Sequence, residues 1–218
     1  MNKNNILLIN KPKHWTSNDV IRKFKSITKI KKVGHSGTLD PLASGLLLLG
    51  YNNGTKLLNK IINDDKVYIA TIHFNYETST LDSEGLIINY KYEQIPINNI
   101  INSLEHFLKI EYYQIPPKFS AIKINGKKAY ELARNNIDFE IKPKLVKLYN
   151  YNIISYENNE LIIELSVSKG FYIRSFCRDL GSHINNYANL ANLVRTQIGD
   201  FKIEDAIEIK DLNENIIK

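Results

Sequence analysis

The sequence predicts an α+β fold, with a mixed, mostly antiparallel sheet flanked by helices. Helix-like and strand-like patterns of apolar residues both recur along the 218 residues, but they do not alternate regularly as strand–helix–strand units would. Two strand-like runs, Leu145–Ser155 and Leu161–Val167, flank a polar turn at Glu157–Glu160. This arrangement is typical of an antiparallel hairpin. The length is compatible with one or two domains.

The remaining elements follow from local patterns. Thr16 can cap a helix that has Asp19 as its third residue, and the apolar face of this helix comprises Val20, Ile21, Phe24 and Ile27. Further helices are expected at Thr55–Ile62, Ile97–Leu108, Tyr130–Arg134 and Ile173–Ile184. Further strands are expected at Ile6–Ile9, Leu46–Leu49, Lys66–Phe74 and Ser120–Ile124. The chain is expected to end in a short tail at Glu204–Lys218.

Composition narrows the class of protein. The formal net charge of +6 and the isoelectric point near 9.1 favour a polyanionic partner without requiring one. Cys177 is the single cysteine, which excludes an internal disulfide and fits a reducing compartment. The N-terminal segment has too short an apolar run for a signal peptide, and no segment is long and apolar enough for a membrane span. We therefore expect a cytoplasmic protein with no membrane association.

The stretch Gly34–Gly50, GHSGTLDPLASGLLLLG, is the most informative part of the sequence. A polar loop rich in glycine leads directly into Leu46–Leu49, a run that indicates a strand buried on both faces. Such a loop is held rigidly at one end and can present a side chain to a substrate. Its one carboxylate is Asp40, the candidate catalytic group. The alternative interpretation is that Asp40-Pro41 simply initiates a turn.

A cluster of lysines precedes this loop at the end of the first predicted helix. Lys29, Lys31 and Lys32 lie where cations interact favourably with the helix dipole. They are therefore either a solvated helix end or a phosphate site beside the loop.

Five sequence blocks, in order from Lys11 to Phe201, resemble the TruB family of tRNA pseudouridine synthases. The loop Gly34–Pro41 with Ala43, Gly45 and Leu46 resembles the family's catalytic motif. Lys11-Pro12 and Thr16-Ser17 resemble its N-terminal element, and Thr78, Thr80, Asp82 and Gly85 its TxTxDxxG segment. A fourth block comprises Gln114, Pro116-Pro117, Ser120-Ala121, Lys123, Gly126, Tyr130 and Ala133-Arg134. The last block comprises Ser168, Gly170, Tyr172-Ile173-Arg174, Asp179-Leu180-Gly181, Arg195-Thr196, Gly199 and Phe201.

Three features depart from the family pattern. His14 stands where the family usually has glycine and Asn75 where it often does, and a histidine can take φ > 0 at some energetic cost, which reshapes the first turn without losing it. The chain also ends too early for the C-terminal RNA-binding domain of longer members. The resemblance thus implies a single pseudouridine synthase catalytic domain over residues 1–218, without a separate C-terminal RNA-binding domain.

The resemblance implies an isomerase that converts uridine to pseudouridine in the T-loop of tRNA, at position 55. This reaction needs a carboxylate beside the ribose, which either attacks C1′ or removes a proton from C2′, and it needs no metal or redox cofactor. Asp40 is the implied carboxylate. The implied partner is the T-stem-loop of tRNA. We expect no obligate protein partner and a monomer.

The resemblance also implies roles for five substrate-binding residues. Tyr68 is implied to stack on the target base, Tyr172 to contact it, and Leu193 to form an apolar wall of the pocket. His35 is implied to fill the space that the flipped base leaves. Arg174 is implied to be the cation beside Asp40, and because it opposes the helix dipole it needs an anionic partner. The competing carboxylates, Asp82 and Asp179, are interpreted as structural.

Simpler structural interpretations and other functions remain open. Tyr68 could pack in a strand, Leu193 in the core, His35 could cap a turn, and Arg174 could lie at the surface or contact a phosphate. The chain could also be a tRNA-binding or tRNA-folding protein without turnover, although a pure binder needs no buried carboxylate. A third possibility is a synthase of the same family that acts on another RNA or is guided by partner proteins.

Overall fold

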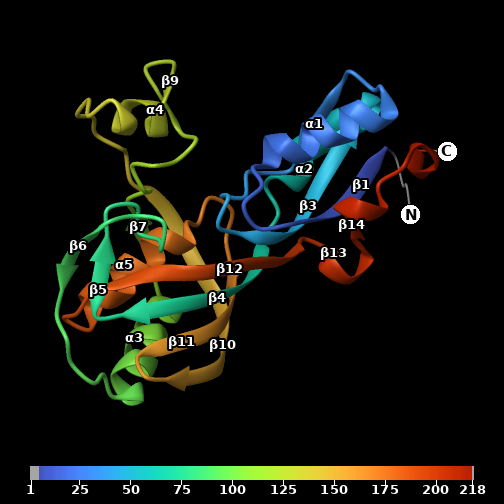
Figure 1. Cartoon of the computed structure of the whole chain (residues 1–218). Helices are drawn as coiled ribbons and strands as arrows, with labels where there is room; N and C mark the ends of the chain where they lie inside the picture. Colours follow the sequence, from blue (N-terminus) through green and yellow to red (C-terminus); the bar gives the residue numbers. More distant parts are fainter. Residues whose placement is uncertain (1–4, 218) are drawn as a thin grey trace. The chain divides into compact units, whose positions relative to one another are not determined.

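The computed structural model describes residues 5–217 and forms two compact units (Figure 1). Unit 1 comprises Met1–Ile69 and Leu193–Lys218, and unit 2 comprises Ala70–Asn192. Strands β4 (Lys66–Phe74) and β12 (Ala188–Ile198) contribute residues to both units. The single domain expected over residues 1–218 stays a prediction. Met1–Asn4, the start of the segment on which the expectation of no signal peptide rests, lie outside the described residues.

The sheet of unit 1 is centred on β3 (Ser44–Tyr51), whose leucines Leu46–Leu49 are completely buried, as the sequence predicts. Strand β3 pairs antiparallel with β1 (Ile6–Lys11) and β2 (Val33–His35) and parallel with the Val194–Arg195 part of β12. A short strand, β13 (Phe201–Lys202), pairs with the end of β12.

The C-terminal segment of unit 1 is more ordered than the tail that the sequence predicts. It contains β14 (Ile207–Glu208), which pairs parallel with β1, and the 3-10 turns Ile203–Asp205, Ile209–Asp211 and Glu214–Ile217. Leu212 is buried in the same core cluster as β1 and β3. Two-residue strands and single turns carry too little periodic pattern to be recognised from sequence.

Helix α1 (Ser17–Thr28) forms as predicted, with the capping box of Thr16 and Asp19 at its start. Val20 and Phe24 are completely buried and pack against β1 and β3. The helix predicted at Thr55–Ile62 is instead a 3-10 helix, Asn52–Lys56, followed by α2 (Leu58–Ile61), and neither has a side-chain cap. An uncapped start leaves backbone N–H groups without partners, which favours such short turns.

Unit 2 contains the predicted hairpin of β10 (Lys144–Glu157) and β11 (Glu160–Val167). Asn158 and Asn159 form its turn with φ values of 50° and 62°. This backbone suits the right-handed twist of the paired strands. Strand β4 lies beside β11, and β7 (Glu111–Gln114), which the sequence does not reveal, pairs with β10 on the other side.

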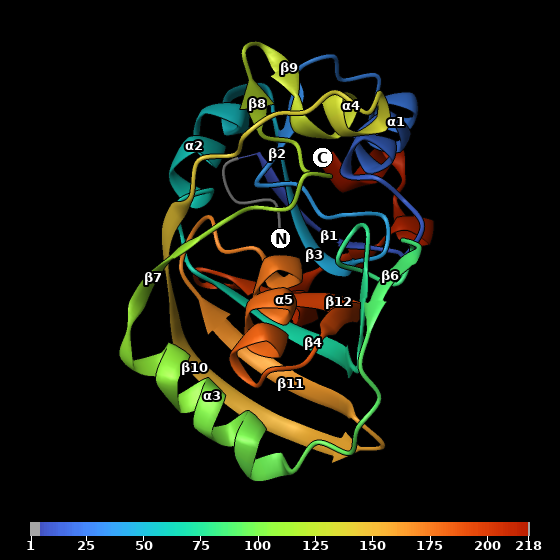
Figure 2. The ribbon, with the colours of Figure 1, turned by 90° about the vertical axis from the view of Figure 1, so that its left-hand side faces the viewer.

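Helices α3 (Ile97–Lys109) and α5 (Ile173–His183) lie side by side on one face of the unit 2 strands (Figure 2). Ser103 of α3 and His183 of α5 join them through a 2.8 Å hydrogen bond between Oγ and Nδ1. The apolar faces predicted for both helices are buried, with Ile100, Leu104, Phe176 and Leu180 fully enclosed. A separate two-stranded ribbon consists of β5 (Tyr76–Thr78) and β6 (Ile87–Tyr90).

The strand predicted at Ser120–Ile124 is wrong for most of its length. Only Lys123–Ile124 form a strand, β8, which pairs with β9 (Lys127–Lys128) around the predicted Asn125-Gly126 turn. The carbonyls of Ser120 and Ile122 instead accept hydrogen bonds from the first N–H groups of α4 (Ala129–Arg134). These carbonyls satisfy groups that would otherwise be unbonded at a helix start, and the upstream residues are therefore not extended.

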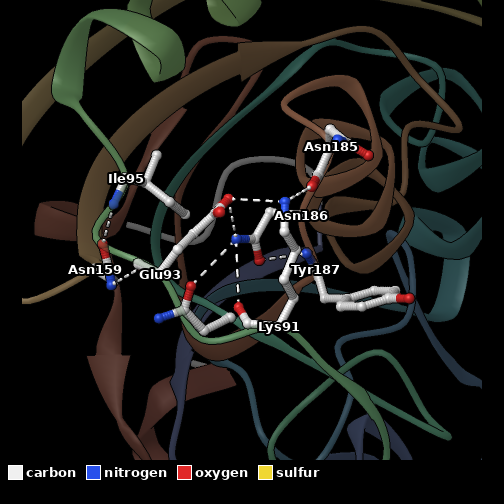
Figure 3. Close-up of polar contacts among 8 residues, drawn as sticks. Lys91, Glu93, Ile95, Asn159, Asn185, Asn186 and Tyr187 are labelled. Atoms are coloured by element: carbon white, nitrogen blue, oxygen red, sulfur yellow. Dashed lines mark hydrogen bonds and ion pairs between the residues drawn. The ribbon is translucent and has the colours of Figure 1, made fainter.

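Asparagine side chains hold the connection between β6 and α3 in unit 2 (Figure 3). Asn186 donates through Nδ2 to the carboxylate of Glu93 at 3.0 Å and to Oδ1 of Asn75 at 3.3 Å. Asn159 accepts from the N–H of Ile95 at 3.0 Å and donates to the carbonyl of Glu93 at 2.8 Å. A segment without secondary structure is thus fixed by buried polar side chains.

The predicted α+β class is confirmed. The described pairings are mostly antiparallel, and β1–β14 and β3–β12 are parallel. Across residues 5–217, no helix is long and apolar enough to span a membrane.

Candidate active site

Asp40 lies in unit 1 on the loop between β2 and β3, and the residue before it is anchored to α1. Ser17, at the start of α1, accepts a 2.9 Å hydrogen bond from the backbone N–H of Leu39. The same hydroxyl donates to the carbonyl of Leu39 at 3.3 Å. Both residues are buried, and Asp40 itself is half-buried. One hydroxyl therefore satisfies both polar backbone groups of the residue that precedes the carboxylate.

The residue after Asp40 is held from the other side. The N–H of His14 donates to the carbonyl of Pro41 at 2.7 Å, and the N–H of Ala43 donates to the carbonyl of Asp40 at 3.1 Å. His14 has φ of 65°, which agrees with a position where the resembled family pattern has glycine. The turn is therefore retained with a non-glycine residue in a left-handed conformation.

Arg195 joins the two ends of the loop. Its guanidinium donates through Nη2 to the carbonyl of Gly37 at 3.2 Å and through Nε to the carbonyl of Leu46 at 2.8 Å. Only 2% of Arg195 is exposed. Gly45 lies opposite Arg195 in the parallel pairing, with φ of 102°, and a Cβ there would come within 2.4 Å of the Arg195 carbonyl oxygen. Only glycine fits this close approach of two strands.

His35 lies at the start of the same loop. Its Nδ1 accepts a hydrogen bond from the N–H of Gly37 at 3.2 Å, which matches the interpretation that it caps a turn. Burial lowers the pKa of His35, and the positive charge of Arg195 lowers it further. The ring is therefore neutral at pH 7. Its predicted role beside the RNA base stays a prediction.

Tyr68 and Leu193, the other two candidates in unit 1, lie on β4 and β12 and are 8% and 7% exposed. On β4 the buried residues alternate, and Tyr68 points to the same side as Lys66 and Ala70. Their contacts with a base stay predictions.

Arg174, in the first turn of α5 in unit 2, is not a surface residue, because only 6% of it is exposed. Within the unit, Nη1 lies 3.4 Å from Oδ2 of Asp82. The predicted place of Arg174 beside Asp40 stays a prediction. The guanidinium also donates to the carbonyls of Thr80 at 3.2 Å and Phe119 at 2.9 Å. The Thr80–Asp82 turn and the loop that contains Phe119 thus fix its orientation.

Asp82 has the structural role that the sequence suggests. Its Oδ1 accepts hydrogen bonds from the hydroxyl of Thr80 and from the N–H of Glu84, which closes the turn of the TxTxDxxG segment. Burial raises the pKa of the other candidate structural carboxylate, Asp179, although Arg178 acts in the opposite direction from 2.7 Å.

Tyr172 immediately precedes α5, and a side chain from β7 holds its backbone. The N–H of Tyr172 donates to Oε1 of Gln114 at 2.8 Å, and Nε2 of Gln114 donates to the hydroxyl of Tyr112 at 2.8 Å. The Lys144 ammonium lies 5.9 Å from the centroid of the Tyr172 ring. Gln114 therefore links Tyr172, and with it the start of α5 that carries Arg174, to a neighbouring strand.

The candidates fall into two groups by position in the chain. Unit 1 holds Asp40 on its loop, His35 at the end of β2 just before that loop, Tyr68 and Leu193, and unit 2 holds Tyr172 and Arg174 at the start of α5. The match to a family model covers His35, Asp40 and Tyr172 and ends one residue before Arg174. The sequence model described as "TruB family pseudouridylate synthase (N terminal domain)" matches residues 25–173. This chain belongs to the TruB family.

Relatives support the same assignment over almost the whole chain. A protein of Ureaplasma urealyticum named "tRNA pseudouridine synthase B" is 58% identical over 210 residues, which cover 95% of this chain and 92% of the relative. A protein of Malacoplasma penetrans with the same name is 44% identical over 216 residues, covering 98% and 93%.

A solved structure shares the fold of this TruB-family chain. A chain in the "Crystal Structure of a Cbf5-Nop10-Gar1 Complex" is 26% identical and superimposes with a TM-score of 0.74. The match covers 95% of this chain and 53% of that chain, so this TruB-family chain spans about half the length of that solved protein.

Sequence reasoning missed three residues that position the candidates: Ser17 and Arg195 hold the Asp40 loop, and Gln114 holds the backbone of Tyr172. Ser17, Gln114 and Arg195 belong to the matching sequence blocks, but nothing local reveals their partners. Arg195 bonds to a carbonyl 158 residues away, and Gln114 to an N–H 58 residues away. The one available signal is that each is a polar residue within a matching block.

Proposed function

We propose that this chain converts uridine to pseudouridine at position 55, in the T-loop of tRNA. The names of the relatives support the reaction and the tRNA substrate. The observation that carries the proposal for the site is the fixation of the Asp40 loop by Ser17, His14 and Arg195. A carboxylate on such a loop can act on a sugar without prior reorganisation.

The reaction is an isomerisation in which the atoms of the base are conserved. The C1′–N1 bond breaks, the base rotates, a C1′–C5 bond forms, C5 loses its proton and N1 gains one. Asp40 acts on the ribose, either as the nucleophile at C1′ or as the base at C2′. Both roles require its ionised form in a partly desolvated site, which needs a compensating cation, and the family pattern implies Arg174 for this role.

The remaining candidates receive the base. Extrusion of the uridine from a folded RNA loop costs a few kcal/mol of unstacking. Stacking on Tyr68 returns about 1–3 kcal/mol, and Tyr172 and Leu193 complete the pocket. The neutral ring of His35 fills the space that the base leaves, because an uncharged imidazole stacks there without a desolvation penalty.

The enzyme works as a monomer in the cytoplasm. Cys177, its single cysteine, is fully buried, and burial raises the pKa of its thiol. A buried protonated thiol is inert, which is consistent with a reducing compartment where tRNA is processed.

The test uses purified full-length protein and an unmodified tRNA transcript, with pseudouridine mapped by carbodiimide adduct formation and primer extension. We expect one modified site, position 55, and none in a matched transcript with cytidine there. Binding without any pseudouridine would favour an RNA-binding protein. Pseudouridine absent from tRNA but present in another RNA would favour a synthase with a different target.

A further inference from the structure

Trp15, the single tryptophan of the chain, lies at the entrance to α1 and is only partly buried. Its ring packs against the core cluster that contains Phe24 and Leu212. Its backbone carbonyl accepts a 2.6 Å hydrogen bond from Nζ of the buried Lys11. The ring is therefore fixed by its surroundings while part of it stays accessible.

Two surface hollows meet at Trp15, and both are lined by Trp15 and Lys23. One, of about 430 Å³, extends to the C-terminal segment at Glu208–Leu212. The other, of about 500 Å³, extends over the exposed side of α1 past Arg22 to Ser26. The partly accessible indole of Trp15 thus lies between the two hollows, and Lys23 lines both of them.

The charges along these hollows favour an anionic occupant. Lys23 is exposed, and the side chain of Arg22 is 75% exposed. The two carboxylates nearby already have partners. Asp19 closes the capping box with Thr16 and lies 3.3 Å from Arg22, and Glu208 accepts from Asn10 at 2.8 Å. By formal charge, three cations line the two hollows (Arg22, Lys23 and Lys210) against two carboxylates (Asp19 and Glu208).

The surface adjoins the Asp40 loop within unit 1. His14 lines the larger hollow, and its N–H donates to the carbonyl of Pro41, the residue after Asp40. A polyanion whose nucleotide reaches Asp40 would therefore pass close to Trp15.

We propose that Trp15, Arg22 and Lys23 form a second RNA-binding surface, on which an unstacked nucleotide lies on the indole while its phosphates contact the two cations. Aromatic rings bind bases through their faces, and neighbouring cations bind the backbone. The proposal rests on the proposed function, because it assumes that tRNA is the substrate.

The single tryptophan makes a direct test possible. The intrinsic fluorescence of the full-length protein is recorded during titration with unmodified tRNA transcript. We expect saturable quenching that weakens as salt concentration rises, with a midpoint equal to the dissociation constant from filter binding. Fluorescence that does not change at saturating tRNA would overturn the proposal.

Two pairs of charge-reversal variants show whether tRNA binding depends on these two cations or only on the net charge of the protein. Arg22→Glu combined with Lys23→Glu should weaken tRNA binding at least tenfold and flatten its salt dependence. Lys60→Glu combined with Lys109→Glu makes the same change in net charge at two other exposed lysines and should change binding less than threefold. Equal effects of the two pairs would show that only overall charge matters and would refute the surface.

The role of Trp15 in binding is tested by measuring KM and kcat separately for two variants. Trp15→Phe keeps a stacking ring and should preserve turnover, whereas Trp15→Ala should raise KM about tenfold with a much smaller effect on kcat. Melting temperatures identify any loss of core packing. If the wild type binds tRNA with quenching but makes no pseudouridine, the proposed function alone fails. If the wild type turns over normally and Trp15→Ala has an unchanged KM, the proposal of a second RNA-binding surface is refuted. The hollows would then have another occupant, such as a protein segment.

Discussion

Arg195 on β12 donates from Nη2 to the carbonyl oxygen of Gly37 at 3.2 Å and thereby holds the loop that carries Asp40. Its Nε holds Leu46, where β3 has already begun. A planar guanidinium can reach two carbonyls at once, whereas an ammonium is a single point of contact. Arg195 is therefore a positioning residue for Asp40.

Replacement of Arg195 by Lys should remove one of these contacts. We expect a loss of about 1–3 kcal/mol in the free energy of unfolding, since the carbonyl of either Gly37 or Leu46 loses its donor. Turnover should fall by about 10–100-fold, the effect of a slightly misplaced catalytic group, with tRNA affinity within about twofold of the wild type. Single-turnover assays well below the melting temperature measure this. Ile198→Val, a buried change in the same strand, is the control, and it should lose stability without losing turnover.

Ser17→Ala should affect the other side of the loop. The buried N–H of Leu39 would lose its acceptor, which costs about 1–3 kcal/mol of folding stability. Because Leu39 precedes Asp40, turnover should fall more than tRNA binding. Ser26→Ala, which removes an exposed hydroxyl from the same helix, should be neutral in urea unfolding and should leave kcat unchanged. Equal behaviour of the two variants would contradict the anchoring role of Ser17.

Asn75 offers a test of a departure from the family pattern. Its φ of 80° suits glycine, but its Oδ1 accepts a 3.3 Å hydrogen bond from Nδ2 of Asn186. Asn75→Gly loses the hydrogen bond and keeps the backbone conformation, whereas Asn75→Ala loses both. The alanine variant should therefore be less stable than the glycine variant by about 1 kcal/mol. Thermal unfolding of both variants checks this, and the reverse order would show that backbone strain is not important there.

His35 should make stability depend on pH. Burial and the charge of Arg195 lower the pKa of His35 in the folded state. As the pH falls through about 6.5, the pKa of histidine in an unfolded chain, the unfolded state therefore binds more protons than the folded state. The contribution of His35 to stability is thus present above that pH and is lost as the pH falls below it. Urea unfolding at pH 8 and at pH 5.5 measures this. Between these two values we expect the free energy of unfolding to fall more for the wild type than for His35→Gln. Equal losses would mean that His35 is not desolvated.

The sequence reveals features whose determinants are close together in the chain. Thr16 and Asp19 are three residues apart and fix the start of α1, and Asn158-Asn159 fix the β10–β11 turn. Leu46–Leu49 reveal a buried strand because no polar residue interrupts them. Even the positive φ of His14 and Asn75 follows from their place in the family pattern.

Features that depend on distant partners are not visible in the sequence. Arg174 is a charged residue on an amphipathic helix, and nothing local shows that it is buried against Asp82 and the carbonyl of Phe119. The same is true of Arg195, whose partners lie on another strand and another loop. Short pairings such as β14 with β1 also escape detection, because two residues cannot define a period.

The substitution Asp40→Asn tests the central claim most directly. It removes the negative charge and keeps the size of the side chain, so tRNA affinity and the melting temperature should stay close to the wild-type values. Pseudouridine formation, measured by release of tritium from C5-labelled uridine in the tRNA transcript, should fall below detection. Turnover within about tenfold of the wild type would show that another group acts on the ribose and would contradict the account.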